Sequence, residues 1–239
     1  MRFPPRKDLI VACWFLLVSL LLAGAAWWAW RQYMSTPPYV DPERFPVRGF
    51  DLSAHNGYAN LNAAAAAGYQ FVILKASEGS SFRDPNFVLN YQKARHAGLK
   101  VGAYHYFRFD RDGVEQGVNF LRSVGLRELD LGLAIDVEDN GNARGVPVDT
   151  VRARLQLMIE YLNMRGHRVM LYSNRDGYGK YLMTPEFRGL PLWICSFSED
   201  NARQTDWTFW QYDHRGRVPG IRGDVDLNVY RGEQLNTKD

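Results

Sequence analysis

The stretch Gly132-Leu-Ala-Ile-Asp-Val-Glu-Asp139 decides how this chain is interpreted. It has the pattern of an apolar strand that ends in acidic residues. Side chains alternate between the two faces of a strand, so Asp136 and Glu138 point the same way, about 7 Å apart at Cα. Two carboxylates on one buried face are costly, because like charges and desolvation both oppose ionisation. The pair therefore indicates either a general acid with a partner carboxylate or, as the alternative, a strand that ends in a solvated acidic turn.

The N-terminal part of the chain carries a long uncharged segment, residues 9–30 (LIVACWFLLVSLLLAGAAWWAW). Its 22 residues match a membrane-spanning helix, which needs about 20. Arg2, Arg6 and Lys7 precede it, and three tryptophans lie at its far end. A basic inner flank and an interfacial aromatic belt predict an N-terminus in the cytoplasm. The chain is thus expected to be a single-pass protein of the cytoplasmic membrane, with its remainder in the periplasm or at the cell surface.

A cleaved signal peptide is the competing interpretation of this segment. Ala23-Gly24-Ala25 resembles an A-x-A cleavage site, and cleavage near Ala25 would make the protein secreted. The apolar run is long for a signal peptide and continues through the tryptophans, which favours an uncleaved anchor.

Charge and cysteine content narrow the possible partners. The formal net charge is +3, but residues 1–31 hold four basic residues and one acidic residue, and the rest holds 25 of each sign. A neutral globular part does not indicate a nucleic-acid partner. Cys13 lies in the apolar segment and Cys195 in the globular part, so no disulfide is expected within one chain.

The remaining sequence divides into a linker and one domain. Residues 32–46 hold four prolines and predict a short, stiff linker, and residues 47–239 are long enough for one globular domain. The predicted strands are Val47–Ser53, Gln70–Ser77, Lys100–Phe107, Leu131–Glu138, Arg168–Ser173, Leu192–Phe197, Thr208–Tyr212 and Asp224–Tyr230. The predicted helices are Leu61–Ala67, Asn86–Ala97, Gly113–Val124 and Val148–Arg165, each followed closely by a glycine that favours helix termination.

Alternating strands and helices predict a parallel sheet with crossover helices, an α/β fold. Eight strands with short or missing later helices favour an irregular (β/α) barrel. A doubly wound open sheet is the structural alternative. It would require a ligand site at its strand ends, and neither G-x-G-x-x-G nor G-x-x-x-x-G-K-[ST] follows any strand here.

Polar residues accumulate where these strands end, which is where the active site of such a barrel lies. Asp51, Asp136, Glu138 and Asp226 come from three strands and can converge there. A glycosidase needs one carboxylic acid to protonate the leaving oxygen, and a carboxylate or substrate group to stabilise the oxocarbenium-like centre. Acids that share a pocket push their pKa values apart, so one can stay protonated near neutral pH. Glu138, with its longer side chain, is the predicted acid.

Aromatic and polar neighbours of these acids suit a sugar, because the apolar faces of sugar rings stack on aromatic rings. Tyr104, Tyr172 and Trp210 are the predicted stacking residues, although aromatic residues in strands more often belong to the core. Lys75 and Asn228 complete the predicted substrate-binding set.

Other enzyme chemistries have weaker support. The five histidines form no H-x-x-x-H or H-E-x-x-H pair, so neither a metal nor another cofactor is expected. A hard cation between Asp51 and Asp136 is possible but nothing requires it. No G-x-S-x-G is present for acyl transfer.

The motifs from Val47 to Glu233 resemble those of the glycoside hydrolase family 25 lysozymes, also called Chalaropsis-type muramidases. The matching pieces include Gly49-Phe-Asp51-Leu-Ser53, Phe71 to Gly79, Asp84-Pro-Asn86-Phe87, Ala97 to Tyr106, Asp136-Val-Glu138, Tyr172-Ser-Asn174, Trp210-Gln-Tyr212 and Val225-Asp226-Leu-Asn228-Val. They occur in family order.

The resemblance implies an irregular barrel that cleaves the β-1,4 bond after N-acetylmuramic acid in peptidoglycan. It assigns the catalytic acids to Asp51, Asp136, Glu138 and Asp226, with Glu138 as proton donor. The role of Asp136 stays open between orienting the substrate's N-acetyl group and acting on the anomeric carbon. A non-catalytic glycan-binding barrel and an enzyme for another N-acetylated glycan are the alternatives. The expected partners are peptidoglycan strands and, through residues 9–30, a lipid bilayer; a monomer is expected.

Overall fold

The computed structural model describes residues 6–34, 38–232 and 234–235. The chain divides into two compact units, residues 1–37 and 38–239, which are considered separately. Arg2, of the predicted basic flank, and residues 35–37, of the predicted linker, lie outside the described residues.

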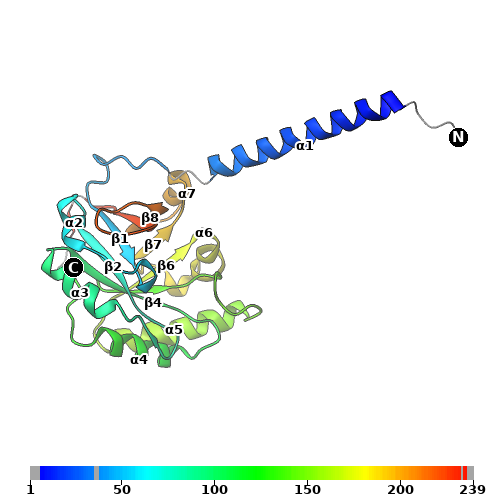
Figure 1. The fold of residues 1–239 in the computed structure, drawn as a ribbon. Coiled ribbons are helices and arrows are strands. Elements are labelled where there is room, and N and C mark those ends of the chain that lie inside the picture. Colours follow the sequence, from blue (N-terminus) through cyan, green and yellow to red (C-terminus); the bar gives the residue numbers. More distant parts are fainter. Residues whose placement is uncertain (1–5, 35–37, 233, 236–239) are drawn as a thin grey trace. The chain divides into compact units, whose positions relative to one another are not determined.

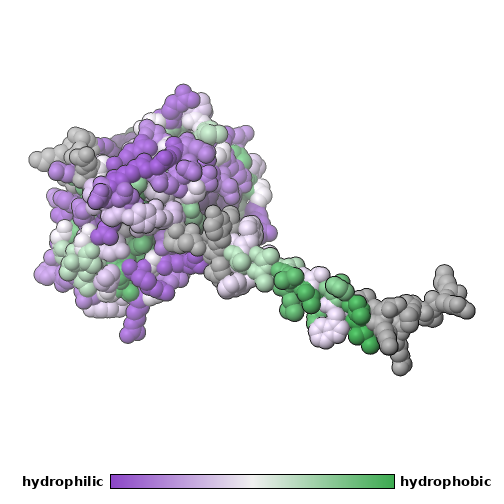
Figure 2. Space-filling model, turned by 90° about the horizontal axis from the view of Figure 1, so that it is seen from above, coloured by the Kyte–Doolittle hydropathy of each residue, from purple (hydrophilic) through white to green (hydrophobic). Residues whose placement is uncertain are grey.

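The first unit contains one helix, α1 (Arg6–Met34), of 29 residues. At 1.5 Å per residue it is about 43 Å long, more than a bilayer core requires. Its segment Cys13–Trp30 is long and apolar enough to cross a membrane. Figure 2 shows hydrophobic residues gathered along this helix, whereas the visible face of the second unit is mostly hydrophilic.

The second unit is a closed barrel (Figure 1). Its strands are β1 (Arg48–Leu52), β2 (Phe71–Glu78), β3 (Phe82–Arg83), β4 (Lys100–Tyr106), β5 (Leu133–Asp136), β6 (Val169–Asn174), β7 (Leu192–Cys195), β8 (Phe209–Gly216) and β9 (Val225–Tyr230). β1 pairs with both β2 and β9, which closes the ring of eight strands, and β3 is a short antiparallel addition to β2. The predicted eight-strand barrel is confirmed, and closure excludes the open-sheet alternative.

As predicted, the later helices are short, and after residue 164 none of the described helices has more than five residues. The helices of this unit are η1 (Ala54–Asn56), α2 (Leu61–Ala66), α3 (Phe87–His96), α4 (Gly113–Val124), α5 (Val148–Met164), α6 (Arg175–Gly177), η2 (Tyr178–Leu182), η3 (Pro185–Phe187) and α7 (Glu199–Arg203). α2 to α5 each connect two parallel strands. Between β7 and β8 only the five-residue α7 is present in the described chain.

The last strand departs from the predicted parallel order, since β9 is antiparallel to both β8 and β1. The physical reason is the short connection: eight residues separate β8 from β9, too few for a crossover, which needs a dozen or more. As a consequence, β9 begins at the end of the barrel where the parallel strands finish. Asp226 therefore reaches that end from the start of its strand, not from its end.

Two apolar layers fill the domain, and the alternation of the strands separates them. The inner layer lies inside the barrel and includes Phe71, Ile73, Ala134, Trp193 and Phe209. The outer layer, between the barrel and its helices, includes the alternate residues of the same strands. Its members from β5 and the residue after it are Leu133, Ile135 and Val137. This confirms the predicted alternation through Glu138.

Leu131 is an exception to this alternation, because it packs with the inner layer and not with Leu133. Gly132, between them, has φ +73°, a left-handed conformation that interrupts the regular alternation. The strand consequently starts only at Leu133.

The predicted linker contributes to both units. α1 continues to Met34, and Phe45 is buried in the barrel unit, where its ring contacts Trp207 and Trp210. Val47 is buried as well. The barrel unit therefore begins before Val47.

Candidate active site

The candidate active site lies at the mouth of the barrel, the end where the seven parallel strands finish and β9 begins. Asp51 lies near the end of β1, Asp136 ends β5, Glu138 follows two residues later, and Asp226 is the second residue of β9. All four predicted acids therefore reach the same end of the barrel. Three of them come from strands far apart in the sequence.

Asp51 and Asp226 form the first pair, directly opposite each other in the antiparallel register of β1 and β9. Asp51 is buried, and its Oδ2 accepts hydrogen bonds from Gln211 Nε2 and Asn228 Nδ2, both at 2.8 Å. Burial, and then the charge of Asp226, raise the pKa of Asp51 well above its ordinary value. Burial also raises the pKa of Asp226, and the attraction of His214 opposes it.

Asp136 and Glu138 form the second pair. Asp136 is buried, and its Oδ1 has no hydrogen-bond partner among the residues that the structure describes. Burial, and then the charge of Glu138, raise the pKa of Asp136 well above its ordinary value, while Lys75 lowers it. An orphaned buried carboxyl oxygen is expensive in a native protein and is expected where a ligand completes the bonding.

Glu138 is the less buried member of this pair. Asn174 Nδ2, at the end of β6, donates to Glu138 Oε2 at 3.3 Å. Burial raises the pKa of Glu138, and this hydrogen bond opposes the rise because it favours the ionised form. Glu138 thus combines a raised pKa with a partly exposed position, two properties that suit a general acid.

Lys75 lies beside the acids. Its Nζ donates to Glu78 Oε2 at 2.8 Å and lies 5.2 Å from the centre of the Tyr106 ring. The ammonium group faces Asp136 closely enough to lower that carboxyl's pKa. Lys75 is thus positioned near the acids, as predicted, but already has a carboxylate partner.

Tyr104 keeps its candidate role, whereas Tyr172 does not. Tyr104 is half-buried and its ring lies edge-on to Trp193, with centroids 6.1 Å apart. Tyr172 is only 8% exposed, and its hydroxyl donates to Gln211 Oε1 at 2.8 Å. A sugar cannot stack on a ring that is covered by protein, so Tyr172 instead supports the amide that holds Asp51.

Trp210 and Asn228 also differ from the prediction. Trp210 is fully buried in the outer layer, and its Nε1 donates to Ser196 O at 2.7 Å. Alternation along β8 turns its neighbour Gln211 inward and therefore Trp210 outward. Asn228 faces the barrel interior but is fully buried, with Nδ2 on Asp51 and Oδ1 accepting from Trp193 Nε1 at 2.7 Å. In this structure its amide therefore supports Asp51.

Comparison with known proteins shows the family to which this chain belongs. The model of "Glycosyl hydrolases family 25" matches residues 50–221, which is most of the chain. The chain belongs to glycosyl hydrolase family 25. The family resemblance seen in the motifs is confirmed, and the chain is a glycoside hydrolase.

Individual members of family 25 cover much of the chain. The N,O-diacetylmuramidase of Arthroderma benhamiae is 31% identical over 228 residues, which are 90% of this chain and 94% of that protein. The autolytic lysozyme of Clostridium acetobutylicum is 30% identical over 185 residues, 77% of this chain, and the match spans only 56% of that lysozyme. A family 25 glycosyl hydrolase from Bacillus anthracis has a similar solved structure, with a TM-score of 0.72, 30% identity, and coverage of 83% of this chain and 94% of that one.

Gln211, Trp193 and Asn174 support the acids of this family 25 site but were not among the predicted site residues. Gln211 and Asn174 appeared in the sequence analysis only as parts of the matched motifs. Gln211 and Trp193 hold Asp51 directly and through Asn228, and Asn174 contacts Glu138. The alternation of β8 could have identified Gln211, because a strand that turns Trp210 outward must turn Gln211 toward the acids.

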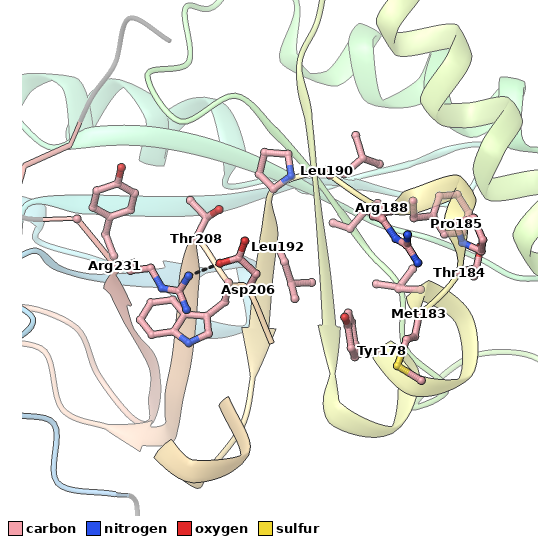
Figure 3. A pocket seen from close by; sticks show the side chains of 18 residues that line it. Tyr178, Met183, Thr184, Pro185, Arg188, Leu190, Leu192, Asp206, Thr208 and Arg231 are labelled. Carbon is pink, nitrogen blue, oxygen red and sulfur yellow. Dashed lines mark hydrogen bonds and ion pairs between the residues drawn. The ribbon is translucent and has the colours of Figure 1, made fainter. Parts of the chain in front are cut away.

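A cavity of about 920 Å³ lies elsewhere in the family 25 domain (Figure 3). It lies beside the starts of β7 and β8, where Leu192 and Thr208 line it, and Arg231 forms an ion pair with Asp206 at one side. None of the four acids lines it. Among the described residues, no three His, Cys, Asp or Glu side chains are grouped as a metal site requires, and the expectation of a cofactor-free site stays a prediction.

Proposed function

We propose that this chain is a muramidase that hydrolyses the β-1,4 bond between N-acetylmuramic acid and N-acetylglucosamine in peptidoglycan. The observation that carries the proposal is the Asp136–Glu138 pair: one acid with a raised pKa at the mouth, beside a buried carboxyl that has an unpartnered oxygen. Family 25 relatives named lysozymes and N,O-diacetylmuramidases support the substrate class.

Glu138 acts as the general acid in this proposal. Burial raises the pKa of its carboxyl, which favours the protonated form that donates to the leaving oxygen. Asp136, whose Oδ1 is free, supplies the polar contact at the reacting sugar, either to its N-acetyl group or at the anomeric carbon. Asp51 and Asp226 form a second pair of acids at the mouth, opposite each other on β1 and β9. Tyr104 and Lys75 bind the substrate.

Helix α1 holds the enzyme in the cytoplasmic membrane, with the barrel outside the cytoplasm as a monomer. Its length and the apolar segment Cys13–Trp30 support this part of the proposal. Peptidoglycan lies outside the cytoplasm, so either an anchor or a signal peptide cleaved near Ala25 would deliver the domain to its substrate. Alkaline carbonate extraction of membranes, together with N-terminal sequencing of the mature protein, separates the two. A soluble protein that begins near residue 26 would refute the anchor.

The activity is tested with the detergent-solubilised full chain on purified peptidoglycan and on chitin oligomers. We expect new reducing ends from peptidoglycan, with N-acetylmuramic acid at the reducing end by mass spectrometry. Glu138→Gln should abolish release, whereas Glu128→Gln, an exposed acid near the other end of β5, should not. Equal activity of Glu138→Gln and the wild type would remove Glu138 from its role, and binding without turnover would favour a glycan-binding protein.

A further inference from the structure

An exposed aromatic ring lies at the mouth of the barrel and has no part in the mechanism above. Trp193 and Cys195 in β7 face the barrel interior, and Phe197, two residues further, continues the same alternation beyond the strand end. Phe197 is 41% exposed, unlike these two buried neighbours. The chain thus presents an apolar ring to solvent directly above a packed interior.

The register of the neighbouring strands places this ring next to an acid. Cys195 pairs with Gln211 of β8, and Gln211 pairs with Asn228 of β9, so these three residues form one layer across the barrel. Continuing the alternation of these strands by one step toward the mouth gives Phe197, His214 and Asp226 as the next layer. β8 is irregular between Gln211 and Asp213, and this irregularity brings His214 into the layer.

Direct contacts agree with this placement. The rings of Phe197 and His214 are packed together, with centroids 4.5 Å apart and planes at 52°. The charge of His214 acts on the carboxyl of Asp226, which is the next residue of the layer. Both rings are exposed, so they form a small two-ring surface beside an acid of the site.

The loop that carries Phe197 is fixed in place. Ser196 N donates to Gln211 O at 3.0 Å, and Trp210 Nε1 donates to Ser196 O at 2.7 Å. Ser196 Oγ donates to Ser198 O at 2.9 Å, which holds the loop just after the ring. A rigid aromatic surface loses little conformational entropy when a ligand binds to it.

We propose that Phe197 and His214 form a stacking surface that binds one pyranose ring of the glycan strand beside Asp226. The proposal rests on the glycan substrate of the proposed function and adds to it a specificity-determining site. The C–H face of a pyranose is apolar and flat, which suits an exposed aromatic ring, and its hydroxyls can bond to the imidazole edge. This pair replaces Trp210, which is buried, as the predicted aromatic contact on this side of the mouth.

Binding is measured without turnover, in the full chain carrying Glu138→Gln. The probe is a tetrasaccharide of alternating N-acetylglucosamine and N-acetylmuramic acid, titrated by isothermal calorimetry. We expect Phe197→Ala to raise its Kd about tenfold, equivalent to about 1.4 kcal/mol, and Phe197→Tyr to restore most of the affinity. His214→Ala should weaken binding less. The matched control is Leu126→Ala, a fully exposed apolar residue on the loop before β5.

The outcomes separate this proposal from the proposed function. The stacking surface would be overturned if Phe197→Ala and Leu126→Ala bound the tetrasaccharide with equal Kd at unchanged melting temperature. It would also be overturned if the full chain carrying only Glu138→Gln bound no tetrasaccharide. If the wild type instead releases no reducing ends while the Phe197 effect on binding persists, the hydrolase proposal fails and the stacking surface stands.

Discussion

The hydrogen bond from Asn174 to Glu138 gives a prediction about the pH dependence of hydrolysis. Asn174 Nδ2 donates to the carboxylate form of Glu138 and so opposes the rise in pKa that burial causes. Replacing Asn174 by serine removes this donor. Serine keeps the other role of Asn174, because the side-chain oxygen accepts from Gly177 N and caps α6. The variant is therefore expected to fold normally.

The expected effect has a definite sign. Loss of the donor destabilises ionised Glu138, so the acid keeps its proton to higher pH and the alkaline limb of the kcat/KM profile moves upward. Hydrogen bonds to charged groups contribute about 1.5–3 kcal/mol, and this one is long at 3.3 Å and partly exposed, so we take about 1 kcal/mol. That corresponds to a roughly fivefold higher ratio of variant to wild-type kcat/KM on the alkaline limb than at the optimum.

The assay is release of reducing ends from solubilised peptidoglycan across the pH range. Asn174→Asp serves as the second variant, since it also keeps the cap but adds a like charge beside Glu138. Its alkaline limb should move further in the same direction. An alkaline limb that stays in place in Asn174→Ser, or moves to lower pH in Asn174→Asp, would contradict the assignment of Glu138 as the titrating acid.

Other predictions concern stability. Trp193→Phe leaves the buried Oδ1 of Asn228 without its donor and should lower the free energy of unfolding by about 1–3 kcal/mol in urea titrations; an unchanged midpoint would show that this bond contributes nothing. Gly113→Ala would place a Cβ 1.9 Å from the backbone oxygen of Arg154, so the α4–α5 contact must open. We expect the free energy of unfolding to fall by at least about 1–3 kcal/mol. Gly179→Ala is the control and should leave it unchanged, because no atom lies within 4 Å of the added Cβ. Burial lowers the pKa of His105 to about 3 from 6.5, so the unfolded chain takes up its proton first as pH falls. Its contribution is complete above pH 6.5 and is lost toward pH 3 at roughly 1.4 kcal/mol per pH unit; His105→Gln should lack that part of the decline, and parallel curves would refute it.

Local signals explain why the elements were predictable. The helix Gly113–Val124 was predicted to the residue, because it begins with a capping Asp112, which accepts from Glu115 N at 2.9 Å, and ends at Gly125, whose φ is +63°. The strand β3 has two residues and no periodicity, so no pattern announced it. The antiparallel direction of β9 could be predicted only from the short connection before it, which cannot form a crossover.

The candidate site was predictable in part for the same reason. The acids stand out because carboxylates at the end of an apolar strand are unusual. Whether an aromatic or amide side chain faces the mouth depends on the phase of each strand, and one residue changes it. Trp210 and Gln211 are adjacent, yet one is buried behind the barrel and the other holds Asp51. Irregularities such as the one after Gln211 change that phase in ways that only the three-dimensional structure records.

The pairing of β1 with β9 also governs when a newly made chain can become active. Asn228 and Asp51, joined by a hydrogen bond, are 177 positions apart in the sequence, and Asp226 pairs with Asp51 in the same ladder. While the polypeptide is still emerging from the ribosome, its first strand has no partner on that side and the acid pair does not exist. The hydrolase therefore assembles this acid pair only after β9 has been synthesised, and fragments that end before β9 lack Asp226, one of the four acids.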